Sequence, residues 1–209
     1  MKPNTRIKIL LVDDHAVMRL GLAALLKTQK DLNVIGDVGD GKAALEFVKS
    51  ARPDVIIMDL MMPDLSGVET TRRLLAIDPS LRILVLTTYG TSNDLACALE
   101  AGASGALLKT ADLPDLVDAI HKIAQGGCYT SPEIQKILMT DPPISGLSEQ
   151  QSKVLDSITR GLSNDDIARQ LGISVPRVKE HIATLFSKLG AANRTEAAAI
   201  ALRKLIVKL

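Results

Sequence analysis

Four stretches of the sequence decide the fold: ILLVDDH at 9–15, VIIMDLMMPDLSG at 55–67, ILVLTTYG at 83–90 and ASGALLKT at 103–110. Each contains an apolar run that is too short for a helix and is followed by residues with helical periodicity. The sequence therefore predicts parallel strands joined by crossover helices. We expect five strands that alternate with five helices, which is an α/β doubly wound five-stranded parallel sheet.

Each apolar run ends at a polar side chain. Asp13 and Asp14 follow the first run, and Asp59 follows the second. Thr87 follows the third and Lys109 the fourth. The carboxyl ends of parallel strands share one edge of the sheet, where ligands bind in this architecture. Three carboxylates, a hydroxyl and an ammonium group are therefore expected to converge there.

The predicted cluster has the chemistry of phosphoryl transfer. Clustered carboxylates repel one another unless a cation lies among them, and oxygen ligands suit a hard cation such as Mg²⁺. We expect Asp13 and Asp14 to hold Mg²⁺. One carboxylate, Asp59, is left to accept a phosphoryl group as the nucleophile. Lys109 would pair with the phosphoryl oxygens, and the Thr87 hydroxyl would donate a hydrogen bond to them.

In this order the four stretches resemble the receiver domain of two-component response regulators, which has a flavodoxin-like fold. A single Asp after a strand is more often a turn residue or a helix N-cap, so the ordered set carries the argument. The resemblance implies that a sensor histidine kinase phosphorylates Asp59, and that Asp13, Asp14, Asp59 and the Met61 carbonyl surround Mg²⁺. Ala106 stands where receivers usually carry an aromatic switch residue. We therefore expect a weaker or rerouted switch.

Charge is distributed unevenly along the 209 residues. Residues 1–144 carry 15 basic and 18 acidic side chains, whereas residues 145–209 carry 10 and 6. The second part is therefore the better partner for a polyanion. Prolines and a glycine between Thr140 and Gly146 stop helices and predict a boundary. We expect a receiver at 1–126, a linker at 127–146 and a second domain at 147–209.

The second domain is predicted to be a small all-α unit of four helices. Ser148 caps the first helix, residues 164–171 form the second, and Ser174 caps a longer third helix. A short turn with Gly172 joins the second and third helices, which is typical of a helix-turn-helix motif. Several side chains of the third helix are expected to be exposed and to face a DNA groove. These are Arg177, Lys179, Glu180, Ala183, Thr184 and Lys188.

Residues 147–201 resemble the LuxR-type DNA-binding domain, and their coupling to a receiver points to a NarL/FixJ-type transcriptional regulator. The resemblance implies that double-stranded DNA is a partner and that Lys179, Glu180 and Ala183 approach base edges. It also implies a final helix, beginning near Arg194, that takes part in a homodimer. We assign Lys188 and Arg194 to phosphate contacts or to structural roles.

Other functions remain open. An aspartate-based phosphohydrolase of the haloacid-dehalogenase type also uses Asp, Thr and Lys at strand ends, but it usually has a second acid where this chain has Met61. Recognition of RNA or single strands needs stacking aromatic rings, and aromatic residues make up 2% of the chain. A DNA-binding regulator that works without phosphorylation is a further alternative.

The lengths of the apolar stretches and the spacing of the cysteines indicate where in the cell the protein is expected. The apolar stretches are shorter than the ~18 residues of a membrane span, and the basic N-terminus leads directly into a strand. Cys97 and Cys128 have neither metal-ligand nor disulfide spacing. We expect a cytoplasmic protein with no membrane partner and no enzyme activity beyond phosphoryl transfer to itself.

Overall fold

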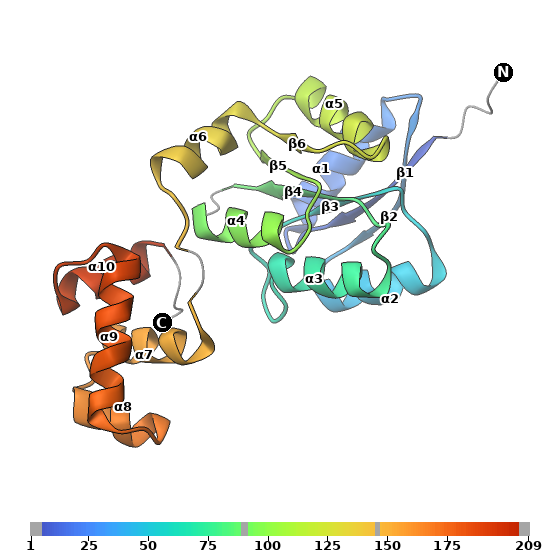
Figure 1. The fold of residues 1–209 in the computed structure, drawn as a ribbon. Coiled ribbons are helices and arrows are strands. Elements are labelled where there is room, and N and C mark those ends of the chain that lie inside the picture. Colours follow the sequence, from blue (N-terminus) through green and yellow to red (C-terminus); the bar gives the residue numbers. More distant parts are fainter. Residues whose placement is uncertain (1–5, 89–91, 145–146, 205–209) are drawn as a thin grey trace. The chain divides into compact units, whose positions relative to one another are not determined.

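The computed structural model describes residues 6–88, 92–144 and 147–204, and it divides into two compact units (Figure 1). The first unit contains the strands and ends at Asp141, and the second contains the last four helices. Residues 1–5 of the predicted receiver, 145–146 of the predicted linker and 205–209 of the predicted second domain lie outside the described residues.

The first unit is built on a parallel sheet with the order β2-β1-β3-β4-β5-β6. Its strands are β1 (Ile7–Val12), β2 (Leu32–Val38), β3 (Val55–Met58), β4 (Ile83–Thr87), β5 (Gly105–Leu108) and β6 (Tyr129–Thr130). From β1 the chain moves first to β2 on one side and then to β3 on the other. This reversal of strand order is the place where doubly wound sheets bind ligands, at the carboxyl ends of the strands.

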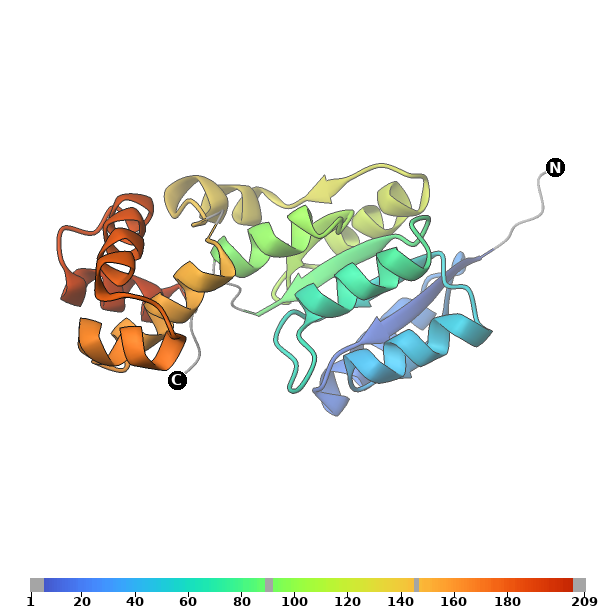
Figure 2. The same ribbon diagram turned by 60° about the horizontal axis from the view of Figure 1, so that its bottom comes forward.

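Helices cover both faces of the sheet (Figures 1 and 2). On one face, α1 (Ala16–Lys27) and α5 (Leu113–Ala124) pack on Ile9 and Leu11 of β1. On the other face, α2 (Gly41–Ser50) and α3 (Gly67–Ile77) pack on Leu10 and Val12. Successive residues of a strand point to opposite faces, so a sheet buried on both sides requires unbroken apolar runs. The runs in the sequence meet this requirement.

The sheet has six strands, one more than the predicted five. The additional strand, β6, lies in the segment predicted to be a linker, and it pairs with the edge strand β5. A Cβ atom on Gly105 would lie 2.0 Å from the Tyr129 carbonyl oxygen, so only glycine permits this approach. Pairing satisfies backbone groups that β5 would otherwise expose at the edge. Part of the predicted linker is therefore structured with the first unit.

A further helix of the predicted linker, α6 (Pro132–Thr140), begins with Ser131 as its N-cap. The Ser131 hydroxyl accepts a hydrogen bond from the backbone N–H of Ile134. Ile134 is fully buried in a cluster with Ala106 of β5 and with Leu95 and Ala98 of α4 (Ser92–Glu100). The side of the sheet next to β5 is therefore covered by α6 as well as by α4.

The second unit contains the four predicted helices, α7 (Glu149–Thr159), α8 (Asn164–Leu171), α9 (Val175–Leu189) and α10 (Arg194–Arg203). Ser148 caps α7 and forms a capping box with Gln151, and the Ser174 hydroxyl caps α9. Gly172 ends α8 with φ of 65°, a left-handed conformation that suits glycine. The short turn between α8 and α9 completes the predicted helix-turn-helix motif.

Candidate functional site

The acidic residues at the ends of β1 and β3 are held close together by the sheet. The backbone N–H of Asp13 donates to the Val38 carbonyl at 3.2 Å, and that of Asp59 donates to the Val12 carbonyl at 2.8 Å. Asp13 and Asp59 are buried, whereas Asp14 is exposed. One ligand atom each from Asp13, Asp14, His15 and Asp59 lies within 4.8 Å of the others. The structure thus brings together the three carboxylates that the sequence placed at this edge.

Gly67 allows the start of α3 to lie close to the Asp59 backbone. Gly67 begins α3, and a Cβ atom there would lie 2.0 Å from the Asp59 carbonyl oxygen. Ser66 caps the helix by accepting a hydrogen bond from the backbone N–H of Glu69. The start of α3 can therefore pack directly against the Asp59 backbone only because residue 67 has no side chain.

Lys109 bridges the two buried carboxylates. Its Nζ lies 2.6 Å from Asp13 Oδ2 and 3.0 Å from Asp59 Oδ2. Its backbone N–H donates to the Thr87 carbonyl at 2.7 Å, which keeps the end of β5 beside the end of β4. All three charged side chains are at most 5% exposed. The ammonium group is therefore positioned to contact an anion bound at Asp59.

Burial and the neighbouring charges shift the pKa values of Asp59 and Lys109. Burial raises the pKa of Asp59 above its usual value, and the neighbouring Asp13 carboxylate adds to the rise. The hydrogen bond and charge of Lys109 oppose it in part. Burial alone would lower the pKa of Lys109, but its bonds to Asp13 and Asp59 raise that pKa overall. The site therefore keeps its lysine charged, and its two buried carboxylates share that single cation.

Thr87 ends β4, the strand beside β3, and Met61 follows Asp59 by two residues. The Thr87 side chain is fully buried, and its hydroxyl oxygen has no hydrogen-bond partner among the described residues. A buried hydroxyl without a partner costs free energy, and a phosphoryl oxygen would supply one. The backbone N–H of Met61 donates to the Asp59 carboxylate, which helps to orient it. The predicted role of the Met61 carbonyl as a metal ligand stays a prediction.

The residues present fit Mg²⁺. The donor set consists mainly of carboxylate oxygens, two buried and one exposed, as a hard cation that keeps part of its water shell requires. Two residues beside these carboxylates were not predicted from the sequence. His15 Nδ1 lies 2.8 Å from Asp14 Oδ1 and 3.2 Å from Asp13 Oδ1, and Arg19 donates a hydrogen bond to the Asp13 carbonyl. Only their proximity to the paired aspartates in the sequence could have indicated them.

In the second unit, α9 carries the predicted DNA-facing residues. All of them are exposed, while Val178, Leu185 and Leu189 on the opposite side of the helix are buried. Arg177 Nη1 lies 3.0 Å from Glu180 Oε2, so these two exposed side chains are paired. The six exposed residues are Arg177, Lys179, Glu180, Ala183, Thr184 and Lys188. The helix therefore presents the predicted polar surface.

Lys188 and Arg194 differ in their surroundings. Lys188 is exposed, and its Nζ donates to Gln151 Oε1 at 3.0 Å. Arg194 is half-buried and donates to the Leu162 carbonyl and to Asn164 Oδ1. These bonds join the start of α10 to the start of α8. Of the two roles predicted for Arg194, its contacts favour the structural one.

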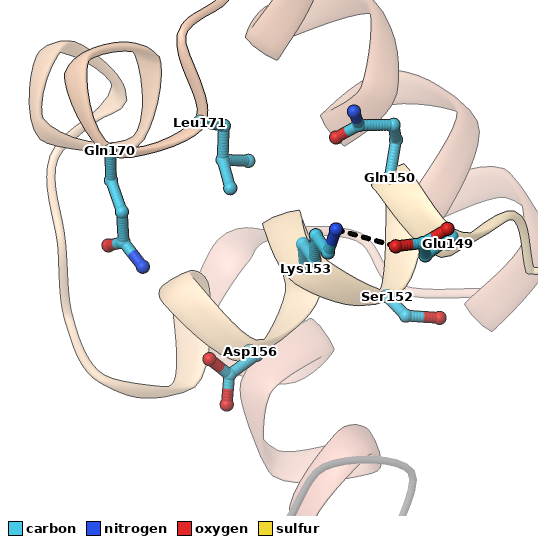
Figure 3. Close-up of a pocket in the computed structure, with 7 residues that line it drawn as sticks. All are labelled: Glu149, Gln150, Ser152, Lys153, Asp156, Gln170 and Leu171. Carbon is cyan, nitrogen blue, oxygen red and sulfur yellow. Dashed lines mark hydrogen bonds and ion pairs between the residues drawn. The ribbon is translucent and has the colours of Figure 1, made fainter.

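An open groove between α7 and α8 offers no comparable chemistry (Figure 3). None of the side chains that line it is buried, and Lys153 Nζ pairs with Glu149 Oε1 at 2.6 Å. The lining residues are Glu149, Gln150, Ser152, Lys153, Asp156, Gln170 and Leu171. The groove is a solvated surface feature, and the reactive groups lie at the edge of the sheet.

Two family models match the chain, the response regulator receiver domain at residues 9–121 and the bacterial regulatory proteins of the luxR family at residues 145–201. The chain is a response regulator. With a receiver followed by a LuxR-type helix-turn-helix domain, this response regulator is a DNA-binding member of a two-component system. Both resemblances found in the sequence are thereby confirmed.

Known response regulators match this one along nearly its whole length. Response regulator protein VraR of Staphylococcus aureus is 34% identical over 196 residues, which cover 91% of this chain and 94% of VraR. The structure of ChrA, a response regulator of a heme-sensing two-component system, is 35% identical with a TM-score of 0.57, covering 97% of this chain and 99% of ChrA. RcsB from Salmonella enterica serovar Typhimurium, bound to promoter P1flhDC in the presence of phosphomimetic BeF3⁻, is 25% identical with a TM-score of 0.71. That match covers 96% of this chain and 100% of the RcsB chain.

The response regulator contains no helix, among those the structure describes, with the length and apolar character needed to cross a membrane.

Proposed function

We propose that this response regulator is a cytoplasmic transcription factor switched by phosphorylation of Asp59. The observation that carries the proposal is the ion pair of the buried Asp59 carboxylate with Lys109 at 3.0 Å. At the end of the neighbouring strand β4, the Thr87 hydroxyl has no hydrogen-bond partner among the residues that the structure describes. A sensor histidine kinase supplies the phosphoryl group. We expect no enzyme activity beyond phosphoryl transfer to itself.

In the proposed reaction an oxygen of the Asp59 carboxylate attacks phosphorus, and the bond from phosphorus to the donor nitrogen or oxygen breaks. Lys109 releases part of its contact with Asp59 and pairs with a phosphoryl oxygen, while the Thr87 hydroxyl donates to another. Asp13, Asp14, Asp59 and the Met61 carbonyl would hold Mg²⁺, which would neutralise charge on the phosphoryl oxygens. Hydrolysis as a haloacid dehalogenase is not supported, because Met61 occupies the position of the second acid.

The chemical test uses the full chain with acetyl phosphate and Mg²⁺. Intact-mass measurement should show the gain of one phosphoryl group in the parent and in Asp64→Asn, a matched control in the same loop whose carboxylate is 81% exposed. Asp59→Asn should fold and gain none. If Asp59→Asn is modified as fully as the parent, Asp59 is not the acceptor. If none of the three proteins is modified, the result favours the alternative of a regulator that works without phosphorylation.

We propose that α9 enters the major groove of duplex DNA, with Lys179, Glu180 and Ala183 near base edges and Lys188 at a phosphate. Exposure of this face and its position as the second helix of the motif support the placement. Arg177 and Thr184 flank the reading surface. Arg194 acts through the bonds that hold α8 and α10 together.

The DNA contacts are tested with a randomised duplex library at several salt concentrations. Lys188→Ala should weaken binding to all sequences alike and lower the salt slope by about one. Glu180→Ala should change the preference at one or two positions, with discrimination altered by about 1–3 kcal/mol and little effect on the slope. If Glu180→Ala lowers all affinities equally and keeps the preferences, α9 is not the reading helix.

We propose that the regulator acts as a homodimer. The apolar side of α1 supports this, because Val17 is 84% exposed, Leu20 is 69% exposed, and the small residues Gly21 and Ala24 beside them are exposed as well. An exposed apolar stripe of this kind marks a protein contact. Leu20→Glu should lower the mass measured by light scattering in the presence of acetyl phosphate and Mg²⁺. If Leu20→Glu associates as the parent does, α10 is the remaining candidate for the dimer contact.

A further inference from the structure

The chain enters α1 without the usual helix cap. His15 is the N-cap residue, its side chain makes no capping hydrogen bond, and the first turn of α1 contains no acidic residue. Helix N-termini normally rely on such groups to satisfy free backbone N–H groups and to fix the direction of the helix. The turn that carries Asp13 and Asp14 therefore has to be held by other contacts.

Asp13 is held through each of its polar groups. Its backbone N–H binds the Val38 carbonyl of β2, Oδ1 accepts the His15 N–H at 2.8 Å, and Oδ2 contacts Lys109. Its carbonyl lies beyond the ladder of β1 and β2, which ends where Val12 pairs with Val38. The guanidinium group of Arg19 donates a hydrogen bond to that carbonyl.

Arg19 joins three elements at this point. Its backbone N–H bonds to the His15 carbonyl in the first turn of α1, and its Nε lies 3.4 Å from Asp37 Oδ1 at the end of β2. A Cβ atom on Gly39 would lie 3.5 Å from Arg19 Nη1, so the guanidinium lies directly over the chain that leaves β2. The Arg19 side chain is only 17% exposed. The planar guanidinium makes these two bonds from separate nitrogen atoms in fixed directions, whereas a lysine would have to reach both acceptors from one nitrogen.

We infer that Arg19 is a positioning residue for the Mg²⁺ site. By anchoring the Asp13 carbonyl to α1 and β2, it fixes the turn from which the carboxylates of Asp13 and Asp14 reach the metal. Residues that orient metal ligands without touching the metal typically change metal affinity about 10–100-fold when they are removed. The inference rests on the proposed use of these carboxylates as Mg²⁺ ligands.

A purely electrostatic role for Arg19 predicts the opposite effect. A positive charge close to a cation site repels the metal, so its removal should tighten Mg²⁺ binding. The Asp37 carboxylate, 3.4 Å from Arg19 Nε, offsets part of this repulsion but does not reverse its sign. The sign of the change in affinity therefore separates positioning from charge.

The experiment measures Mg²⁺ binding to the full chain by isothermal titration calorimetry. Arg19→Met keeps the apolar part of the side chain and removes its donors and charge, whereas Arg19→Lys keeps the charge. The matched control is Arg82→Met, since Arg82 also donates to a carbonyl, that of Ser80 at 3.2 Å, but lies before β4. We expect both Arg19 variants to bind Mg²⁺ about tenfold more weakly and the control to be unchanged.

A second readout distinguishes positioning from general damage. With acetyl phosphate, the Mg²⁺ concentration for half-maximal phosphorylation should rise about tenfold in the Arg19 variants, while the rate at saturating Mg²⁺ stays within about twofold of the parent. If Arg19→Met does not fold, Arg19→Lys carries the test. Tighter or unchanged Mg²⁺ binding, or a lower rate at saturating Mg²⁺ with unchanged affinity, would overturn the inference. A parent that binds Mg²⁺ but is never modified would instead refute the proposed function.

Discussion

Replacing Ala106 by tyrosine tests how closely α6 is joined to the sheet. Ala106 is 1% exposed and packs in one cluster with the fully buried Ile134, and the Ser131 N–H donates to the Ala106 carbonyl at 3.2 Å. An aromatic ring at residue 106 would have to enter the buried cluster that Ala106 shares with Ile134. Overpacking of this kind costs about 1–3 kcal/mol. We expect Ala106→Tyr to displace α6 and not simply to restore an aromatic switch.

A double-mutant cycle gives the magnitude. Ile134→Ala alone should cost about 2–5 kcal/mol, because it removes a fully buried side chain. Together with Ala106→Tyr the loss should be smaller than the sum, since the ring then enters the space vacated by the isoleucine. For residues in contact, the expected coupling is about 1–3 kcal/mol.

Hydrogen exchange resolved by segment measures these free energies in the full chain. The amides of 131–140 should lose protection in Ala106→Tyr and regain it in part in the double variant. Met139→Ala is the matched control, because Met139 lies on the same helix and is 79% exposed, so its effect should stay within about 0.5 kcal/mol. The reasoning is refuted if the free-energy losses of the two substitutions simply add and the amides of α6 stay as protected from exchange in Ala106→Tyr as in the parent.

Three further outcomes are expected. Lys109→Met leaves two buried carboxylates without their cation, so it should lower the free energy of unfolding measured in urea titrations by about 3–5 kcal/mol, and by less when Mg²⁺ is present. If the variant is as stable as the parent in the absence of Mg²⁺, the pairing is contradicted. Because burial raises the pKa of folded Asp59, its ionised form costs stability above the ordinary aspartate pKa. Asp59→Asn should therefore be more stable than the parent at neutral pH, and the gain should shrink as the pH falls from the raised pKa toward the ordinary aspartate value, below which it disappears. Thermal unfolding between pH 3 and 8 measures the gain, and a loss of stability at neutral pH would contradict the expectation. Gly67→Ala, whose Cβ would lie 2.0 Å from the Asp59 carbonyl, should slow phosphorylation by acetyl phosphate about tenfold or more, whereas Gly21→Ala, with nothing within 4 Å, should not.

The sequence alone determined the elements whose signals are local. The central strands appear as continuous apolar runs because both of their faces are buried, and the polar residues that follow them mark the shared edge of the sheet. The caps Ser148 and Ser174 act within a single helical turn, so a few adjacent residues reveal them. Both family resemblances depend on such local patterns, and both were found.

Only the tertiary structure decided the features that depend on pairing between distant segments. β2 contains Asn33, Gly36 and Asp37 and is only partly buried, so no clear apolar run marks it. β6 has two residues and exists because β5 offers an unpaired edge beside Gly105. This pairing assigned part of the predicted linker to the first unit and brought Ile134 into one buried cluster with Ala106.

The detailed arrangement of the site also required the fold. The sequence placed a lysine and three carboxylates at one edge of the sheet, but not the bridging of Asp13 and Asp59 by Lys109. It gave no sign that Arg19 anchors the Asp13 carbonyl or that Arg194 joins α8 to α10. Long flexible side chains can reach many positions, and the partner each one finds is set by distances between elements that lie far apart along the chain.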